Sequence, residues 1–238
     1  MKGYTDIHSH LLYGIDDGAQ TRADMEAMLD AAYADGITSI FATPHVTPGV
    51  YPLPTEQIAQ RLDEARAYCR MKGYMLDISA GAEILFTPAL ERFAQEGRLP
   101  ALGDTRHILV EFMPDIGYAE LSAAVGMMER AGYGVIIAHI ERYDCLRRRG
   151  NVFRLKDSCD VRYQVNCQSL LKKQGFFRDR FLKQCLKLEL IDGVATDAHD
   201  CARRPCRMEK AHSLLAQKYG QEYASRLTCG DILNSHDA

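Results

Sequence analysis

Histidine and carboxylate side chains recur along this chain, each at the end of a short apolar run. The first place is DIHSH, with His8 and His10, and the last is TDAH, with Asp197 and His199. Side chains of the same kinds occur at four positions between them: His45, Glu83, Glu111 and His139. Imidazole and carboxylate groups are ligands that manganese, iron and zinc accept in proteins. The residue types therefore predict a site for divalent metal ions.

One histidine at the end of a strand is usually structural, so it is the joint pattern that is informative. Burying this many polar groups without partners would cost several kcal/mol, and metal coordination removes that cost. A single ion would leave some of these ligands unused, so we expect two or three divalent ions that share bridging carboxylates.

The spacing of the ligands indicates which elements position them. From His10 through His45, Glu83 and Glu111 to His139 the gaps are 35, 38, 28 and 28 residues. Roughly 30 residues is the length of one strand–helix–strand unit. Apolar and β-branched runs predict strands over residues 4–10, 38–45, 75–84, 107–112, 134–140, 161–167 and 192–199. Helical periodicity predicts helices over residues 21–35, 55–72, 88–95, 119–131, 144–157, 178–189, 207–219 and 221–227.

Strict alternation of strands and helices predicts an α/β fold with a parallel sheet and crossover helices. The sheet could be open or closed into a barrel. An open nucleotide-binding sheet usually has a glycine-rich first turn, and here the first strand ends in His-Ser-His. In a parallel barrel the carboxyl ends of all strands meet at one rim. Since residues i and i+2 of a strand face the same way, we expect His8 with His10, and Asp197 with His199, to face one cavity.

The length and composition are those of one soluble domain, or of two small ones. The 238 residues carry 29 Lys and Arg against 32 Asp and Glu, a net charge of −3, and 47% are hydrophobic. This balance argues against disorder and against a non-specific nucleic-acid binder. No run of 18 apolar residues predicts a membrane helix, and the first residues do not resemble a secretory leader. We therefore expect no membrane insertion and a cytoplasmic location.

The eight cysteines do not form a C-x-x-C pair, which argues against a zinc ribbon or a redox motif. We expect reduced thiols, with Cys201 and Cys206 as the pair closest in sequence. Cys201 and Arg207 have the C-x₅-R spacing of thiol phosphatases, but the intervening ARRPC lacks the glycines of a phosphate loop.

Further polar residues lie next to the predicted ligands. GIDDGA follows the first strand, and one of its carboxylates, Asp16 or Asp17, could join the ligands or simply form a turn. Arg142 follows His139, and Arg203 and Arg204 follow His199. Arginine at the rim of a metal pocket is suited to holding phosphate oxygens.

Together, DIHSH, DDGA, TPH, GAEI, VEF, AHIERY and TDAH resemble the polymerase and histidinol phosphatase (PHP) superfamily. They are most similar to its bacterial manganese-dependent protein-tyrosine phosphatases of capsule and exopolysaccharide loci, over essentially the whole chain. The resemblance implies a distorted (β/α)7 TIM-like barrel, in agreement with the seven strands expected, as a single domain over residues 1–238. It also implies a site with three metal ions, manganese first, with iron or zinc as alternatives.

Position by position, the resemblance implies a ligand set for each ion. The first ion would take His8, His10, Glu83 and Asp197. The second would take Glu83 as a bridge, Glu111 and His139. The third would take Asp17, His45 and His199. Arg142 and Arg204 would hold the phosphate. One departure is Val46, which follows TPH where the family often has a histidine or a basic residue.

The resemblance implies hydrolysis of phosphotyrosine on a protein, namely the C-terminal tyrosine cluster of a bacterial tyrosine kinase that regulates capsule or exopolysaccharide synthesis. A PHP-type phosphatase of a small metabolite such as histidinol phosphate shares the same ligands and stays open. A non-catalytic regulatory protein would be favoured by a lost ligand, and none is lost. A nuclease would need a basic groove, and the run of arginines at 147–149 is better explained as a solvated helix face.

Overall fold

The computed structural model describes residues 3–51, 53–148 and 150–234. Its strands are β1 (Tyr4–Ser9), β2 (Ile37–Ala42), β3 (His45–Val46), β4 (Asp77–Ala80), β5 (Glu83–Leu85), β6 (His107–Glu111), β7 (Gly134–Ile137), β8 (Val161–Asn166) and β9 (Gly193–Ala195). Its α-helices are α1 (Arg22–Ala34), α2 (Thr55–Lys72), α3 (Leu90–Gln95), α4 (Tyr118–Arg130), α5 (Asn151–Ser158), α6 (Cys167–Leu171), α7 (Phe176–Lys187), α8 (Met208–Tyr219) and α9 (Gln221–Thr228). Two 3₁₀ turns are η1 (Ile140–Arg142) and η2 (Asp231–Leu233).

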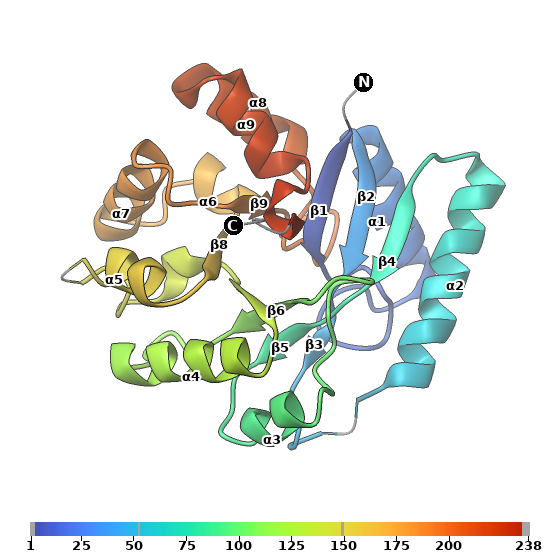
Figure 1. The fold of residues 1–238 in the computed structure, drawn as a ribbon. Helices are drawn as coiled ribbons and strands as arrows, with labels where there is room; N and C mark the ends of the chain where they lie inside the picture. Colours follow the sequence, from blue (N-terminus) through green and yellow to red (C-terminus); the bar gives the residue numbers. More distant parts are fainter. Residues whose placement is uncertain (1–2, 52, 149, 235–238) are drawn as a thin grey trace.

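Every strand pair is parallel, and the strands form two sheets in the orders β1-β2-β4 and β3-β5-β6-β7-β8-β9. The helices lie around the outside of these strands (Figure 1). The predicted α/β class with parallel strands is therefore confirmed. Within the described ranges, each helix is too short or too polar to span a bilayer.

The two sheets are connected along the chain at one edge and by a backbone bridge at the other. At one edge β2 leads into β3, and β4 into β5, across two-residue breaks. At the other, a single bridge joins Ser9 to Ala198, and the His10 N–H donates to the Ala198 carbonyl over 2.9 Å. The strands expected over residues 38–45 and 75–84 are therefore each divided in two. Pro44 has no N–H for a continuing ladder, and at Gly81 a Cβ would lie 2.7 Å from Leu102.

Three other expected boundaries are wrong. The strands expected to reach residues 140 and 199 end at Ile137 and Ala195, because the chain turns just beyond them. The helix expected over residues 144–157 begins only at Asn151, whose side-chain amide donates to the Cys145 carbonyl over 2.8 Å and holds the preceding turn. The short helix α6 has no counterpart among the expected elements.

Local signals determine where the outer helices begin and end. Thr21 and Asp24 form a reciprocal capping box at the start of α1, which satisfies two backbone donors that the helix leaves free. Gly73 ends α2 in the left-handed conformation, which glycine adopts without steric cost. Both helices bury one apolar face against the sheet.

The side chains that lie between the strands are apolar at one end and polar at the other. The apolar ones form a small cluster from several strands and the C-terminal turn: Ile7, Phe41, Leu102, Leu109, Ile136, Ala138, Ala195 and Ile232. Ile232 belongs to η2, and its carbonyl accepts a hydrogen bond from the buried Arg162 side chain. At Gly193 a Cβ would lie 2.7 Å from Ile232. The C-terminal turn thus closes the amino end of the strands and leaves the polar groups at the carboxyl end.

Candidate metal centre

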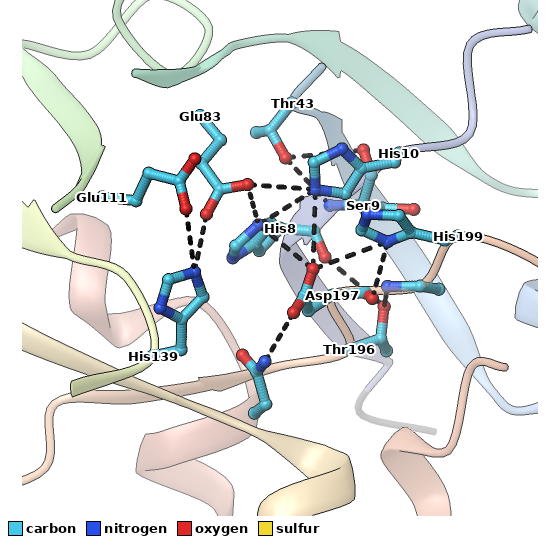
Figure 2. A network of polar contacts seen from close by, with 12 residues as sticks. His8, Ser9, His10, Thr43, Glu83, Glu111, His139, Thr196, Asp197 and His199 are labelled. Carbon is cyan, nitrogen blue, oxygen red and sulfur yellow. Dashed lines mark hydrogen bonds and ion pairs between the residues drawn. The ribbon is translucent and has the colours of Figure 1, made fainter. Parts of the chain in front are cut away.

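Side chains from strands distant in sequence point toward one another at the carboxyl ends of the strands (Figure 2). His8 and His10 come from the end of β1 and the residue after it, and their Nε2 atoms lie 3.2 Å apart. The intervening Ser9 faces away and pairs with Thr43 through its backbone N–H. The expectation that these two histidines face one cavity is confirmed.

Neighbouring side chains orient both imidazole rings through Nδ1. The Nδ1 atom of His10 lies 2.7 Å from Asp16 Oδ2, and that of His8 lies 3.3 Å from Gln164 Oε1. Because a carboxylate or amide oxygen can only accept, each Nδ1 donates. In their neutral form the two rings would therefore direct their Nε2 lone pairs at one point, as metal-ligating histidines do.

Glu83 is the hub of the cluster. Its Oε2 lies 3.1 Å from His8 Nε2 and 3.2 Å from His10 Nε2, and its Oε1 lies 2.7 Å from His139 Nε2. The carboxylate is 1% exposed. It begins β5 directly opposite His45 in the ladder with β3, so the break between β2 and β3 is what brings His45 beside it.

His45 joins two parts of the cluster. Its Nδ1 lies 3.1 Å from Glu83 Oε2 and 3.2 Å from Glu111 Oε1, and its Nε2 lies 3.5 Å from Asp17 Oδ1. Asp17 Oδ1 is also 3.4 Å from His199 Nε2. Of the two acidic residues in the loop after β1, Asp17 thus faces the ligands directly, and Asp16 holds His10.

Two ligands lie outside strands in left-handed backbone conformations. His139 has φ 35° and Asp197 has φ 51°, a region that non-glycine residues rarely adopt and that clusters at functional sites. The expected i, i+2 alternation of a strand is therefore not what brings Asp197 and His199 together. They still meet, with Asp197 Oδ1 at 3.6 Å from His199 Nδ1.

Three groups of side chains have ligand atoms close enough to hold an ion. The groups are His8, His10, Glu83 and Asp197; His45, Glu83 and Glu111; and His10, Asp17, His45 and His199. His139 lies beside the second group, with its Nε2 at 3.6 Å from Glu111 Oε2. All nine predicted ligands thus converge on one site. The first group has the same four members as the ligand set predicted for the first ion. The other two groups differ from the predicted sets, because His10 and His45 each belong to two groups.

Charges in the site are strongly coupled. Burial alone would raise the pKa of Glu83, but the imidazole groups around it outweigh burial and hold that pKa well below its usual range. Burial alone would lower the pKa of His8, but Glu83 and Asp197 raise it above its ordinary value. Burial, with His10 and Arg204 nearby, lowers the pKa of His199 to about 4. The buried carboxylates therefore need positive charge from protons or metal ions.

The donor set fits metal ions better than protons. Two inward Nε2 lone pairs only 3.2 Å apart would both need protons to satisfy the carboxylates, and the protons would then repel. His199 Nε2 is buried and has no hydrogen-bond partner among the residues described. Imidazole nitrogens with shared carboxylate oxygens are ligands for Mn, Fe and Zn.

Arg142 and Arg204 both reach Asp197 from the open side. Their Nη2 atoms lie 2.7 Å from Asp197 Oδ2 and 2.6 Å from Asp197 Oδ1, respectively. Both arginines line a cavity of about 240 Å³, called here the metal-side cavity. Its other lining residues are Pro114, Glu141, Asn166, Gln168, Ser169, Gln174, Arg178, Thr196 and Asp197. Arg203 does not line it.

The profile of the family described as capsular polysaccharide synthesis, CpsB/CapC, matches residues 4–234. The chain belongs to the CpsB/CapC family. The resemblance to the phosphatases of capsule loci is thereby confirmed.

Named relatives match the CpsB/CapC chain over nearly its full length. It is 33% identical over 230 residues to the tyrosine-protein phosphatase CpsB of Streptococcus pneumoniae, with 93% of each chain covered. It is 30% identical over 223 residues to the tyrosine-protein phosphatase YwqE of Bacillus subtilis, with 94% of this chain and 88% of YwqE covered.

Solved structures agree with this family membership. A structure from the work on YwqE of Bacillus subtilis and CpsB of Streptococcus pneumoniae, described as metal-dependent tyrosine phosphatases, superimposes with a TM-score of 0.83, 29% identity, and 92% and 89% coverage of the two chains. An organophosphorus hydrolase mutant from Deinococcus radiodurans reaches a TM-score of 0.64 at 12% identity, covering 98% of this chain and 93% of its own. The second match shows a similar fold alone.

Sequence reasoning missed the neutral side chains that support the ligands of this CpsB/CapC member. Gln164 Nε2 donates to Asn166 Oδ1 over 2.8 Å, and Asn166 Nδ2 donates to Asp197 Oδ2 over 2.6 Å. Tyr143 Oη lies 3.3 Å from His139 Nδ1. A signal was present in the buried strand VRYQVN, where every second residue is polar, since alternate residues face one side of a sheet.

Proposed function

We propose that this chain is a metal-dependent phosphomonoester hydrolase that removes phosphate from phosphotyrosine in a protein. The observation that carries the proposal is the convergence of three imidazole-carboxylate groups, two of which contain Glu83, next to a cavity that Asp197 lines together with Arg142 and Arg204. The relatives named tyrosine-protein phosphatases favour this activity over hydrolysis of histidinol phosphate.

Two or three divalent ions, manganese first, would be held by nine side chains. These are His8, His10, Asp17, His45, Glu83, Glu111, His139, Asp197 and His199. We also propose that these nine side chains are divided among three ions as the family resemblance implies. His10 Nε2 and His45 Nδ1 both lie close to Glu83 Oε2, so Glu83 would help to hold more than one of these ions. When bound, such ions activate water and stabilise charge on phosphoryl oxygens.

The arginines of this chain would hold the phosphoryl group. A guanidinium group has five N–H donors in a fixed plane, and Asp197 uses the Nη2 atoms of Arg142 and Arg204. The remaining donors can bind phosphoryl oxygens, and they stabilise the charge that develops there during transfer. Asp197 thus fixes both arginines while itself facing His8.

Protons at the ligands are controlled by the supporting side chains. Asp16 and Gln164 keep a proton on Nδ1 of His10 and His8, so that Nε2 stays free to bind metal. The tyrosyl leaving group has a pKa near 10, so its departure needs only modest assistance.

We extend this proposal to the closure of the barrel, the substrate and the cellular location. We infer that the two sheets together correspond to the distorted (β/α)7 barrel and that residues 1–238 form a single domain. The substrate would be the C-terminal tyrosine cluster of a kinase of capsule or exopolysaccharide synthesis, in the cytoplasm. The association of the CpsB/CapC family with capsular polysaccharide synthesis supports this choice.

The test measures phosphate release from a phosphotyrosine peptide and from histidinol phosphate, before and after chelation. We expect chelator to abolish cleavage of the peptide, manganese to restore it, and kcat/KM to be greater for the peptide. Arg142→Ala should raise KM while the bound metal, measured by elemental analysis, stays at the wild-type level. Cleavage that persists in His10→Ala under chelation would contradict the proposal.

A further inference from the structure

A second cavity lies beside the metal centre, between α6, α7 and α8. Its volume is about 530 Å³. Leucine side chains from all three helices line it: Leu170, Leu171, Leu182, Leu186, Leu214 and Leu215. We call this cavity the lysine groove, because of its rim.

The rim of the lysine groove is strongly basic. Lys172, Lys173, Lys183 and Lys218 line it, and all four are exposed. None has an ion-pair partner among the residues that the structure describes. The acidic member of the lining, Asp179, already accepts a hydrogen bond from the Gln174 backbone N–H over 2.8 Å. The net charge of the whole chain is −3, so this surface differs in sign from the molecule as a whole.

The lysine groove and the metal-side cavity share one lining residue, Ser169 of α6. Arg178, in the first turn of α7, lines the metal-side cavity together with Arg142 and Arg204. Positively charged side chains therefore line both of these cavities.

We propose that the lysine groove docks a segment of the substrate protein that combines carboxylate and aliphatic side chains and lies near the phosphotyrosine. The proposal rests on the proposed function. Aliphatic side chains would fill the leucine-lined floor, and carboxylates would pair with the lysines at the rim. An exposed rim of this kind increases the rate of encounter and selects the partner by charge. Arg178 would contact the chain between the phosphotyrosine and this segment.

The experiment compares two phosphotyrosine peptides of equal length and p-nitrophenyl phosphate. One peptide carries an extension of Glu and Leu, and the other has Gln in place of every Glu; each is made with the extension before and after the phosphotyrosine. The test variant is Lys183→Glu with Lys218→Glu. The matched control is Lys187→Glu with Lys210→Glu, on the same two helices, at exposed lysines outside the groove.

We expect the wild-type protein to prefer the Glu peptide in one orientation of the extension, and the test variant to lose about tenfold in kcat/KM for it. The variant should cleave p-nitrophenyl phosphate like the wild type. Added salt should reduce the preference of the wild type, because exposed charges are screened. The Lys183→Gln, Lys218→Gln variant should show a smaller loss without charge reversal.

Equal cleavage of the Glu and Gln peptides by the wild type would overturn the groove proposal. So would an equal loss in the control variant, or a wild-type dimer that the test variant converts to a monomer, since the groove would then bind a second copy. None of these results would affect the proposed function. If the wild type cleaves neither the phosphotyrosine peptides nor p-nitrophenyl phosphate in the presence of manganese, the proposed function is overturned as well.

Discussion

Histidine occurs at both ends of the parallel strands, in opposite surroundings. At the carboxyl ends, His8 and His10 face buried carboxylates, and their pKa values are raised against the effect of burial. At the amino end, His107 begins β6 near Arg162. Burial, then Arg162 and Arg106, lowers the pKa of His107 to about 4. The carboxylates beside His8 and His10 need positive charge from protons or metal ions, whereas His107 must stay neutral.

The comparison shows how one set of strands separates chemistry from stability. The carboxyl end contains buried carboxylates whose charge bound metal ions would balance. His139 and Asp197, which have left-handed backbone conformations, also lie there. The amino end is closed by Ile232 and by the buried Arg162 side chain. Substitutions at the carboxyl end should therefore reduce metal binding and activity, and those at the amino end should reduce the free energy of unfolding.

The largest expected effect is at the hub of the carboxyl end. Glu83→Gln removes the carboxylate that faces four imidazole groups, and we expect kcat/KM for a phosphotyrosine peptide to fall about a thousandfold or more. Manganese should raise the melting temperature of the wild-type protein and leave that of the variant unchanged. Elemental analysis with calorimetry measures both. A Glu83→Gln variant that binds metal like the wild type would contradict the assignment of metal binding to the carboxyl end of the strands.

The next effect is at the amino end. Ile232→Ala leaves a cavity in the cluster inside the strands, and we expect the free energy of unfolding to fall by about 3 kcal/mol. Urea unfolding in the presence of manganese measures it. Metal content and kcat at low temperature should stay near wild type. A large loss of kcat in the folded variant would show that the two ends are coupled.

A smaller effect is expected at a supporting residue. Tyr143 is fully buried, its oxygen accepts the Phe112 backbone N–H, and it lies beside His139 Nδ1. Tyr143→Phe should reduce metal affinity or kcat about 10- to 100-fold, as loss of a ligand's orienting partner does. Titration of the metal-free protein with manganese measures it. An unchanged affinity together with an unchanged kcat would remove Tyr143 from the metal centre.

The smallest effect is a pH dependence at the amino end. The unfolded chain binds a proton on His107 below about pH 6.5, and the folded chain binds it only below about 4. The free energy of unfolding therefore falls as pH drops from 6.5 toward 4, by about 1 kcal/mol at pH 5.5. His107→Gln should lack this part of the slope, measured as the difference between the two proteins in urea. Parallel slopes would show that His107 does not stay neutral.

The convergence of the predicted ligands could be foreseen because their types and spacing repeat, and the parallel pairing of the strands follows from strand–helix alternation. The break before His45 follows from Pro44, but its pairing opposite Glu83 was not predictable, because a second break is needed at Gly81, where the backbone packs closely against Leu102. Gln164 and Asn166 were missed because neutral amides in a strand carry no metal signal by themselves. The left-handed backbone at Asp197 and the contacts of its carboxylate with Asn166, Arg142 and Arg204 bring together residues distant in sequence, which no local pattern contains.

The bridge between the first strand and the segment after the last one has a consequence for synthesis on the ribosome. Asp6 is buried, and its carboxylate accepts hydrogen bonds from the backbone N–H and hydroxyl of Thr196, 190 residues later. At roughly 5–20 residues per second, the nascent chain carries its first histidines for some tens of seconds before Asp197 exists. Ile232 emerges later still. The full set of nine predicted ligands therefore cannot assemble until translation is almost complete.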